Sequence, residues 1–360
     1  MSSLYLPSYL SAERKSREID RIVAVQNPTK DRDRFSVAVE QLGFTSGLGV
    51  VAVDTEKDPF DTHEKLMSVL EENGGVGQDN SLDLVYCHGG DGTLNSTLEA
   101  LLEYKALLLS SRAGTANDFD VAMNGGRYNR SRYTPADILD AAMNDQIAPV
   151  QIKLIEMIVN GKIIEGSTDG TPFNSRLLAA NYASFGFTAL ASTGLNGREL
   201  RGLEGLKKDR AEAQTVLSTA KDAKPMAIRF KGNDAEYDST TMDLAFIHSS
   251  RMAKRLRPGV SQIDDELMMY EMQKRDAATL SRTRVLWNFA LLAAGIAPGA
   301  ELFSGESKSF RLEGMKYDGD VSDIYAMTDG EDYKFCSPIE AEVRLTDGTV
   351  PVLSMVHGRR

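Results

Sequence analysis

Two glycine-rich segments contain the residue types best suited to binding phosphate. The first elbow, residues 88–93, reads His-Gly-Gly-Asp-Gly-Thr, and the second elbow, residues 113–119, reads Ala-Gly-Thr-Ala-Asn-Asp-Phe. Glycines let the backbone approach a phosphate, exposed amides point at its oxygens, and a helix N-terminus favours negative charge. Asp91 could orient Mg²⁺ or water beside a triphosphate, or simply cap a helix. One elbow fits an ordinary tight turn equally well, but the pair predicts a nucleotide or phosphate site.

The elements around the elbows predict where this site lies. Each elbow follows an apolar run of strand length, at residues 82–87 and 106–110, and the first also opens a helix over residues 94–104. Upstream, strand-like runs alternate with helical stretches: 21–26, 31–42, 48–53 and 63–72. Such alternation predicts a parallel, doubly wound α/β sheet over about residues 20–145, with both elbows at its carboxyl edge.

The pattern changes after Pro149. Short strand-like runs separated by turn residues follow, at 150–164, 177–183, 226–230, 242–247 and 267–272. They predict a mainly antiparallel β domain, either a sandwich or a barrel, and we expect it to be sandwich-like. Two helical stretches interrupt it, at 198–220 and 277–294.

Composition limits the class of protein. The chain has 360 residues, a formal net charge of −11 and two cysteines, Cys87 and Cys336. Two cysteines are too few for a disulfide framework, and the negative charge argues against a nucleic-acid partner. The N-terminus lacks the apolar core of a signal peptide, and no apolar run is long enough to span a membrane. We therefore expect a cytoplasmic protein.

The two elbows together resemble the catalytic domain of diacylglycerol kinases, including the bacterial lipid kinases and the sphingosine and ceramide kinases. The first elbow is shared with NAD kinases, whereas Asn117-Asp118-Phe119 is more specific to the lipid kinases. The resemblance extends from residue 21 to about residue 350. It implies that the final strands return to the first domain, which gives a nucleotide-binding α/β domain of residues 1–148 plus about 341–360 and a β-rich acceptor domain of residues 149–340.

The resemblance also implies roles for individual residues. Asp91 and Glu331 would be catalytic, with Glu331 of the sequence Asp329-Gly330-Glu331 as the general base. A structural Mg²⁺ would be held by the side chain of Asp265 and by the backbone carbonyls of Gln262 and Leu267. The residues implied to bind ATP are Asn27, Thr55, Gly89, Gly90, Asp91, Gly92, Thr93, Asn95, Gly114, Thr115 and Asn117.

Five positions depart from the family pattern. The Asn-Pro turn continues to Thr29-Lys30 instead of Ser-Gly, Ser96 stands where a Glu is usual, and Thr188 replaces an Asp. Residues 251–255 read Arg-Met-Ala-Lys-Arg, with Met252 to Lys254 in place of glycines, and Asp265 is followed by Glu266 instead of Gly. The first elbow is intact, so the departures concern mainly the acceptor side.

These observations lead to a functional expectation with two alternatives. We expect an ATP-dependent and Mg²⁺-dependent lipid kinase that phosphorylates a diacylglycerol-like hydroxyl. The first alternative is an NAD kinase. The second is a nucleotide- or lipid-binding protein with weak or no kinase activity. Clustered cations at 198–210 and 254–257 could meet anionic headgroups at the inner membrane surface or form an ordinary solvated face. A homodimer is possible.

Overall fold

The computed structural model divides the chain into two compact units, each with its own apolar core. Unit 1 comprises Met1–Lys153 and Asp347–Arg360, and unit 2 comprises Leu154–Thr346. The boundaries lie a few residues beyond the expected 148/149 and 340/341. The residues that the structure describes are 4–6, 17–28, 32–55, 59–72, 81–104, 106–113, 117–127, 130–165, 172–195, 205–222, 224–231, 236–250, 263, 265, 267–273, 306–307, 309–317, 323–329 and 331–358.

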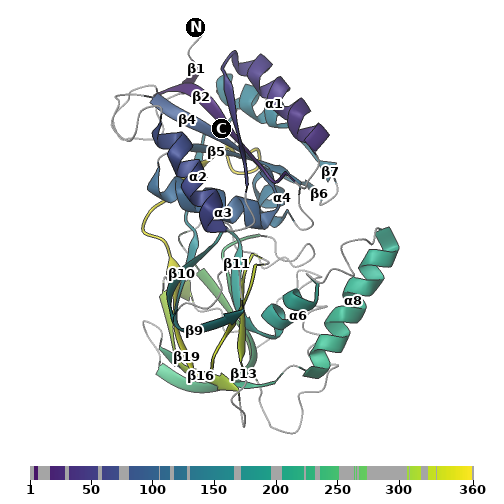
Figure 1. Cartoon of the computed structure of the whole chain (residues 1–360), viewed down its shortest axis with the longest axis vertical. Coiled ribbons are helices and arrows are strands. Elements are labelled where there is room, and N and C mark those ends of the chain that lie inside the picture. The colour runs from purple at the N-terminus through teal and green to yellow at the C-terminus, as the bar shows by residue number, and fades with distance from the viewer. Residues whose placement is uncertain are drawn as a thin grey trace. The chain divides into compact units, whose positions relative to one another are not determined.

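Unit 1 is built on a seven-stranded sheet whose central strands are parallel (Figure 1). β2 (Arg17–Gln26) pairs in parallel with β3 (Val50–Asp54) on one side and with β4 (Ser81–Gly89) on the other. β5 (Leu107–Arg112) extends the sheet beyond β4. The predicted doubly wound α/β class is confirmed, because each apolar run forms a strand of this sheet, although β3 is largely exposed.

The order of these strands creates a switch point. From β2 the chain crosses to β3 on one side, returns to β4 on the other side, and continues to β5. In open α/β sheets, ligands bind in the crevice outside the carboxyl ends of the two strands at which the direction changes. Those strands are β2 and β4, which end at Gln26 and Gly89. The first elbow therefore lies at the switch point.

The edges of this sheet explain the shifted boundaries. β20 (Val350–Val352) pairs in parallel with β5, and β8 (Val150–Ile152) pairs antiparallel with β20. Residues 150–152 thus belong to unit 1, whereas β19 (Ile339–Leu345) belongs to the sheet of unit 2. The sequence merged β8 with the next strand, and it missed β1 (Leu4–Leu6), which pairs antiparallel with β2.

Helices cover both faces of the unit 1 sheet. α1 (Arg32–Ser46) and α5 (Pro135–Met143) pack together and share a core with the sheet. α2 (Pro59–Glu71) and α3 (Asp91–Glu103) pack together on the opposite face, where the hydroxyl of Thr97 lies 3.6 Å from the sulfur of Cys87. α3 therefore rests directly on β4, the strand that leads into it.

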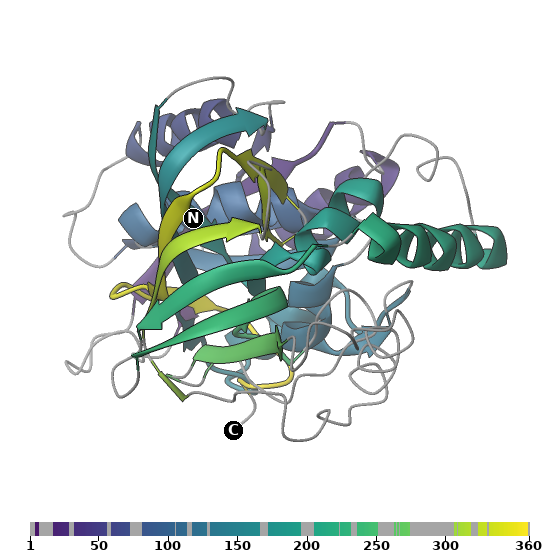
Figure 2. The same cartoon turned by 90° about the horizontal axis from the view of Figure 1, so that it is seen from below.

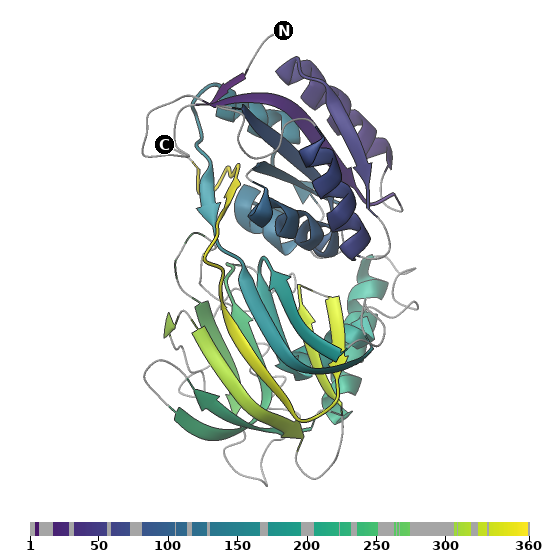
Figure 3. The same cartoon turned by 60° about the vertical axis from the view of Figure 1, so that its left-hand side comes forward.

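Unit 2 contains an eleven-stranded antiparallel sheet, as expected for the second domain (Figures 2 and 3). Its strands are β9 (Ile155–Glu165), β10 (Pro172–Ala179), β11 (Tyr182–Gly186), β12 (Met226–Lys231), β13 (Glu236–Ile247), β14 (Leu267–Gln273), β15 (Glu306–Ser307), β16 (Ser309–Tyr317), β17 (Ile324–Thr328), β18 (Glu331–Phe335) and β19. Eight of them form the circuit β11-β17-β18-β9-β19-β16-β12-β13, which the pairing of β13 with β11 closes. Of the two expected arrangements, this circuit is that of a barrel.

Two helices of unit 2 pack against each other outside this circuit. α6 (Phe187–Leu195) follows β11 directly, and α8 (Gly205–Asp222) packs on α6 (Figure 1). The contact is close, because a Cβ at Gly194 would lie 2.7 Å from the side chain of Thr215. α8 begins later than the predicted helix at 198, and the predicted helix at 277–294 lies outside the described residues. In the part of the chain that the structure describes, no helix is both long and apolar enough to cross a membrane.

Candidate nucleotide site

The first elbow connects β4 to α3, and the space available at this turn requires glycine. β4 ends at Gly89, Gly90 is the N-cap, and α3 begins at Asp91. A Cβ at position 89 would lie 2.3 to 2.6 Å from three side-chain atoms of Thr93. Only glycine fits here, because real Cβ atoms do not approach other atoms so closely. Thr93 and Gly89 therefore pack against each other at the turn.

The N-terminus of α3 is suited to binding an anion. Gly90 has an extended backbone, with φ −88° and ψ −174°, and it has no side chain with which to cap the helix. The first amides of any helix lack an intrahelical acceptor, and the helix dipole places partial positive charge there. The amides of residues 91–93 thus form the kind of site in which phosphate oxygens bind.

The second elbow is hydrogen-bonded to the first. The amide of Ala113, just after β5, donates to the carbonyl oxygen of Gly89 over 3.1 Å. Gly114 and Thr115 lie outside the described residues. Asn117 is the N-cap of α4 (Asp118–Asn124) and adopts the left-handed conformation, φ 56° and ψ 37°, which asparagine tolerates better than most residues.

A small hollow lies between the two elbows. It is lined by residues of β4, α3, β5 and α4: Cys87, Gly89, Gly90, Asp91, Leu94, Ser110, Ser111, Asn117, Phe119 and Asp120. The structure thus brings Asp91 and Asn117 to one place, although 25 residues separate them in the sequence.

The ends of β2 and β3 meet at the same edge of the sheet. The amide of Thr55 donates to the carbonyl oxygen of Gln26 over 2.8 Å, and the side-chain amide of Gln26 donates to Asp54 over 2.5 Å. Asn27 follows Gln26 directly. Asn27 and Thr55, two of the residues implied to bind ATP, therefore lie at the carboxyl edge with the first elbow.

Asn95 has a buried side-chain amide without a hydrogen-bond partner among the described residues. It lies about one turn into α3, and both atoms of its side-chain amide are buried. No hydrogen-bond partner for either atom exists in the described part of the chain. Leaving a buried amide unsatisfied is costly, and a bound ligand would relieve that cost.

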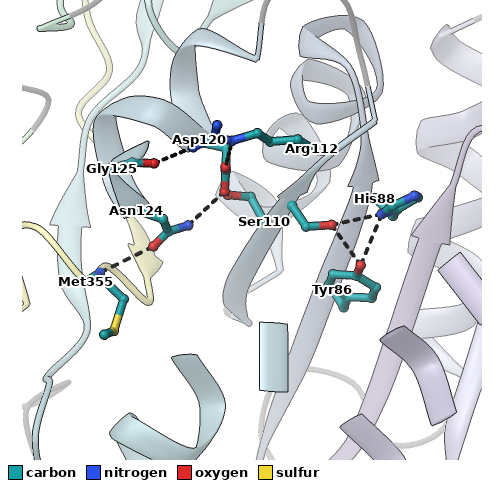
Figure 4. Close-up of polar contacts among 9 residues, drawn as sticks. Tyr86, His88, Ser110, Arg112, Asp120, Asn124, Gly125 and Met355 are labelled. Atoms are coloured by element: carbon teal, nitrogen blue, oxygen red, sulfur yellow. Dashed lines mark hydrogen bonds and ion pairs between the residues drawn. The ribbon is translucent and has the colours of Figure 1, made fainter. Parts of the chain in front are cut away.

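His88 lies in a polar cluster beneath the elbows. Its Nδ1 is 2.8 Å from the hydroxyl of Ser111 and 3.1 Å from that of Tyr86, and these two hydroxyls are 2.7 Å apart (Figure 4). The ring of Phe35 packs on both Tyr86 and His88. The cluster joins the end of β4, where the first elbow begins, to the end of β5, just before the second elbow.

A second polar network, which the sequence analysis missed, lies beneath the second elbow. Asp120 of α4 forms an ion pair with Arg112 at the end of β5, and Asn124 donates to the same carboxylate (Figure 4). Burial raises the pKa of Asp120, while Arg112 and Asn124 act in the opposite direction. The opposite charges of Arg112 and Asp120 suggest an ion pair only when the path of the turn between them is known.

In unit 2, the segment Asp329-Gly330-Glu331 forms a hairpin turn. β17 and β18 pair so that Thr328 lies opposite Glu331, and Asp329 has a left-handed backbone with φ 46°. Gly330 is outside the described residues, but an Asp-Gly turn is typical of such a two-residue hairpin. Glu331 is half-buried at the start of β18.

The side chain of Asp329 binds the backbone where β10 and β11 meet. Its buried carboxylate accepts hydrogen bonds from the amides of Ala180, Asn181 and Tyr182, over 2.5 to 3.2 Å. These amides lie where β10 ends and β11 begins, whereas the sequence predicts a single strand over residues 177–183. Burial raises the pKa of Asp329 to about 7, although the three amides lower it.

The departures from the family pattern have local explanations where the structure describes them. Thr188 lies in the first turn of α6 and donates both its amide, over 2.8 Å, and its hydroxyl, over 2.5 Å, to the buried Asp243. Ser96 lies buried inside α3, with its hydroxyl 3.4 Å from the carbonyl oxygen of Gly92. Residues 29–30 and 251–255 and Glu266 lie outside the described residues.

The implied structural metal site is described only in part. Asp265 is exposed, Leu267 begins β14 with a buried side chain, and Gln262 lies outside the described residues. Among the residues that are described, no group of three or more His, Cys, Asp or Glu side chains could hold a metal ion. The metal role of Asp265 remains a prediction.

Comparisons with known proteins agree with the elbows. The family model for the diacylglycerol kinase catalytic domain matches residues 46–155. A crystal structure described as "a putative diacylglycerol kinase from Bacillus anthracis str. Sterne" aligns over 96% of this chain and 98% of its own, with a TM-score of 0.60 and 14% identity. A second, described as a diacylglycerol kinase from the same organism, aligns over 93% and 96%, with a TM-score of 0.59 and 14% identity.

At such identity the solved structures establish the fold alone, and no curated protein matches the chain. The family model adds a match at the level of sequence, and the matched range includes the first elbow, the second elbow and the Arg112–Asp120 ion pair. Residues 46–155 of this chain therefore match the family model of the diacylglycerol kinase catalytic domain.

Proposed function

We propose that the chain is an ATP-dependent lipid kinase that transfers the γ-phosphoryl group to the hydroxyl of a diacylglycerol-like lipid. The hydrogen bond from Ala113 to Gly89 is the observation that carries this proposal, because it joins both elbows into one site at the switch point of the sheet. The family match over residues 46–155 supports the kinase class.

The residues at this site fit a triphosphate. The amides at the start of α3 would bind phosphate oxygens, and the unsatisfied amide of Asn95 offers both a donor and an acceptor. Asp91, in the first turn of α3, would hold Mg²⁺. Magnesium supplies charge neutralisation on the phosphates, which is the main requirement of phosphoryl transfer.

On the acceptor side, Glu331 is our candidate for the general base. It would accept the proton of the lipid hydroxyl, while that oxygen forms the new bond to the γ-phosphorus and ADP leaves. The hydrogen bonds from the amides of residues 180–182 to Asp329, here called the clamp, support this role, because they fix the hairpin in which Glu331 lies.

We further propose that the protein meets its lipid at a membrane surface. Lys207 and Arg210 on α8 are exposed, and each such cation contributes about 1 kcal/mol near an anionic membrane. Sedimentation with vesicles of neutral or anionic lipid tests this. Binding that neither anionic lipid nor low salt increases would contradict it.

The experiment for the proposed reaction offers radiolabelled ATP together with diacylglycerol, sphingosine or NAD. Transfer to a lipid supports the proposal, and transfer to NAD alone would favour an NAD kinase. If the chain binds ATP without labelling any acceptor in a whole lipid extract, it is a binding protein. That last outcome would agree with the departures from the family pattern, because these departures concentrate on the acceptor side.

A further inference from the structure

The network around Asp120 holds α4 at its centre. Arg112 Nε lies 2.5 Å from Oδ2 of Asp120, and the side-chain amide of Asn124 donates to Oδ1 over 2.9 Å (Figure 4). Arg112 also donates to the carbonyl oxygen of Gly125, just past the end of α4. The side chains of Arg112 and Asp120 are only 6% and 8% exposed. The end of β5 is thus tied to both the middle and the end of α4.

Residues 354–356 hold the other side of α4. The hydroxyl of Ser354 and the amide of Val356 both donate to the carbonyl oxygen of Met123, over 2.6 and 3.0 Å. The amide of Met355 donates to Asn124 over 3.3 Å (Figure 4). Asn124 therefore links the C-terminal segment, residues 353–358, to Asp120 in a continuous chain of hydrogen bonds.

α4 needs this support. It has seven residues, which is too short for a helix to be stable by itself in water. Its N-cap, Asn117, has a left-handed backbone and lines the hollow between the elbows, as does Asp120. The contacts of α4 with β5 and with the C-terminal segment must therefore fix the position of Asn117.

A buried ion pair is a costly way to obtain stability alone. Desolvation of the two charges offsets most of their attraction, and a well-packed apolar pair often stabilises as much. What the pair adds is a defined geometry, because the guanidinium of Arg112 points its donors in fixed directions. A binding site needs such a defined geometry, because its groups must be held to within about 0.5 Å of their productive positions.

We propose that Arg112 and Asp120 are positioning residues that hold Asn117, at the start of α4, in its nucleotide-binding position, and that Asn124 extends this hold to the C-terminal segment. This inference rests on the proposed function, because it takes Asn117 to bind ATP. None of these side chains needs to touch the nucleotide, so the expected effect is on ATP affinity.

The test compares two isosteric substitutions in the full-length chain. Asp120→Asn removes the charge from this network, and Asp83→Asn is the matched control. Asp83 forms a similar pair with Arg21, with two contacts of 2.7 Å, in the β2–β4 pairing. That control pair also anchors the end of α2, through the carbonyl oxygens of Val69 and Leu70.

Calorimetric titration with ATP and thermal unfolding are measured for each protein. We expect Asp120→Asn to weaken ATP binding about tenfold, the effect of losing one well-placed charged contact. We expect Asp83→Asn to lower the unfolding temperature and leave ATP affinity unchanged. The KM for ATP should rise in Asp120→Asn, with the KM for lipid unchanged.

The outcomes separate the two proposals. Wild-type chain that binds no ATP would overturn both the proposed function and this inference. Wild-type chain that binds ATP, with Asp120→Asn binding equally well or with both substitutions weakening it equally, would overturn the inference alone. If Asp120→Asn does not fold, Asn124→Ala replaces it: affinity reduced about threefold supports the inference, and unchanged affinity overturns it.

Discussion

The side chain of Thr93 occupies the space into which any Cβ at position 89 would project. The distances of 2.3 to 2.6 Å leave no room even for the methyl group of alanine. Thr93 lies in the first turn of α3, so a shift of its side chain or of the helix would disturb the amides that we assign to the phosphates. The requirement for glycine at this position is therefore local and steric.

The first prediction follows from this contact. Gly89→Ala should weaken ATP binding by at least about tenfold, because the start of α3 must move. Gly49→Ala is the matched control in the same unit, since a Cβ at Gly49 would meet nothing within 4 Å. Calorimetric titration measures both proteins. ATP affinity in Gly89→Ala equal to that of Gly49→Ala would contradict the assignment of the phosphate site.

A second prediction concerns the proposed chemistry. Glu331→Gln should reduce phosphoryl transfer to lipid by about a hundredfold or more, because a general base typically contributes that factor. ATP affinity should stay at the wild-type value. Asp91→Asn should reduce transfer and also abolish the stimulation by Mg²⁺. Transfer at the wild-type rate in Glu331→Gln would exclude this residue as the base.

A third prediction concerns the clamp at Asp329. Asp329→Ala leaves the amides of residues 180–182 without their acceptor, and we expect it to destabilise unit 2 by about 3 kcal/mol. Asp238→Ala, which removes an exposed ion pair with Arg229, should cost less than about 1 kcal/mol. Urea unfolding measures both. Equal losses would show that the clamp contributes no more than a surface pair.

Burial of Asp243 leads to a prediction about pH. Burial raises the pKa of Asp243 from 3.8 to about 7, against the hydrogen bonds from Thr188. Between these values the folded chain holds a proton that the unfolded chain has released. The contribution of Asp243 to the stability of the folded chain is therefore complete below about pH 4 and is lost as the pH rises through 7.

The stability of unit 2 should thus fall by up to about 1.4 kcal/mol per pH unit in this window from Asp243 alone. Asp329 should add a similar slope. Asp243→Asn keeps a shape that can bond Thr188 but cannot titrate, so it should remove its share of the slope in urea titrations at pH 4 to 7. An unchanged slope would show that the proton is bound elsewhere.

The parts of this molecule that the sequence predicts are those set by local pattern. Apolar runs that end in glycine or Asn-Pro turns gave the strands of the doubly wound sheet, and the two elbows could be placed at one edge from strand direction alone. Contacts between distant residues leave no such pattern. Asp329 bonds amides 147 to 149 residues away, and Asn124 meets Met355 across 231 residues.

Short elements were missed for a related reason. β1 and β8 have three residues each, too few for an alternating pattern, and they are strands only because β2 and β20 offer edges for pairing. The break at Ala180 was also invisible, because its cause is the carboxylate of Asp329 from another part of the chain.

The last prediction concerns Cys87, which lines the hollow between the elbows. Burial raises the pKa of its thiol to about 12, although a hydrogen bond from Thr97 lowers it. At pH 8 roughly one thiol in ten thousand would be ionised, and only the thiolate reacts. Iodoacetamide should therefore label the half-buried Cys336 in the native protein and leave Cys87 unmodified.

Cys336→Ser provides the control, because any label on that variant must be on Cys87. The native variant should take up no label, and urea should make it react fully, since unfolding restores the ordinary pKa and access. Rapid labelling of native Cys336→Ser would mean that β4 opens at the first elbow. In that case the Gly89–Thr93 contact could not be holding the start of α3 in place.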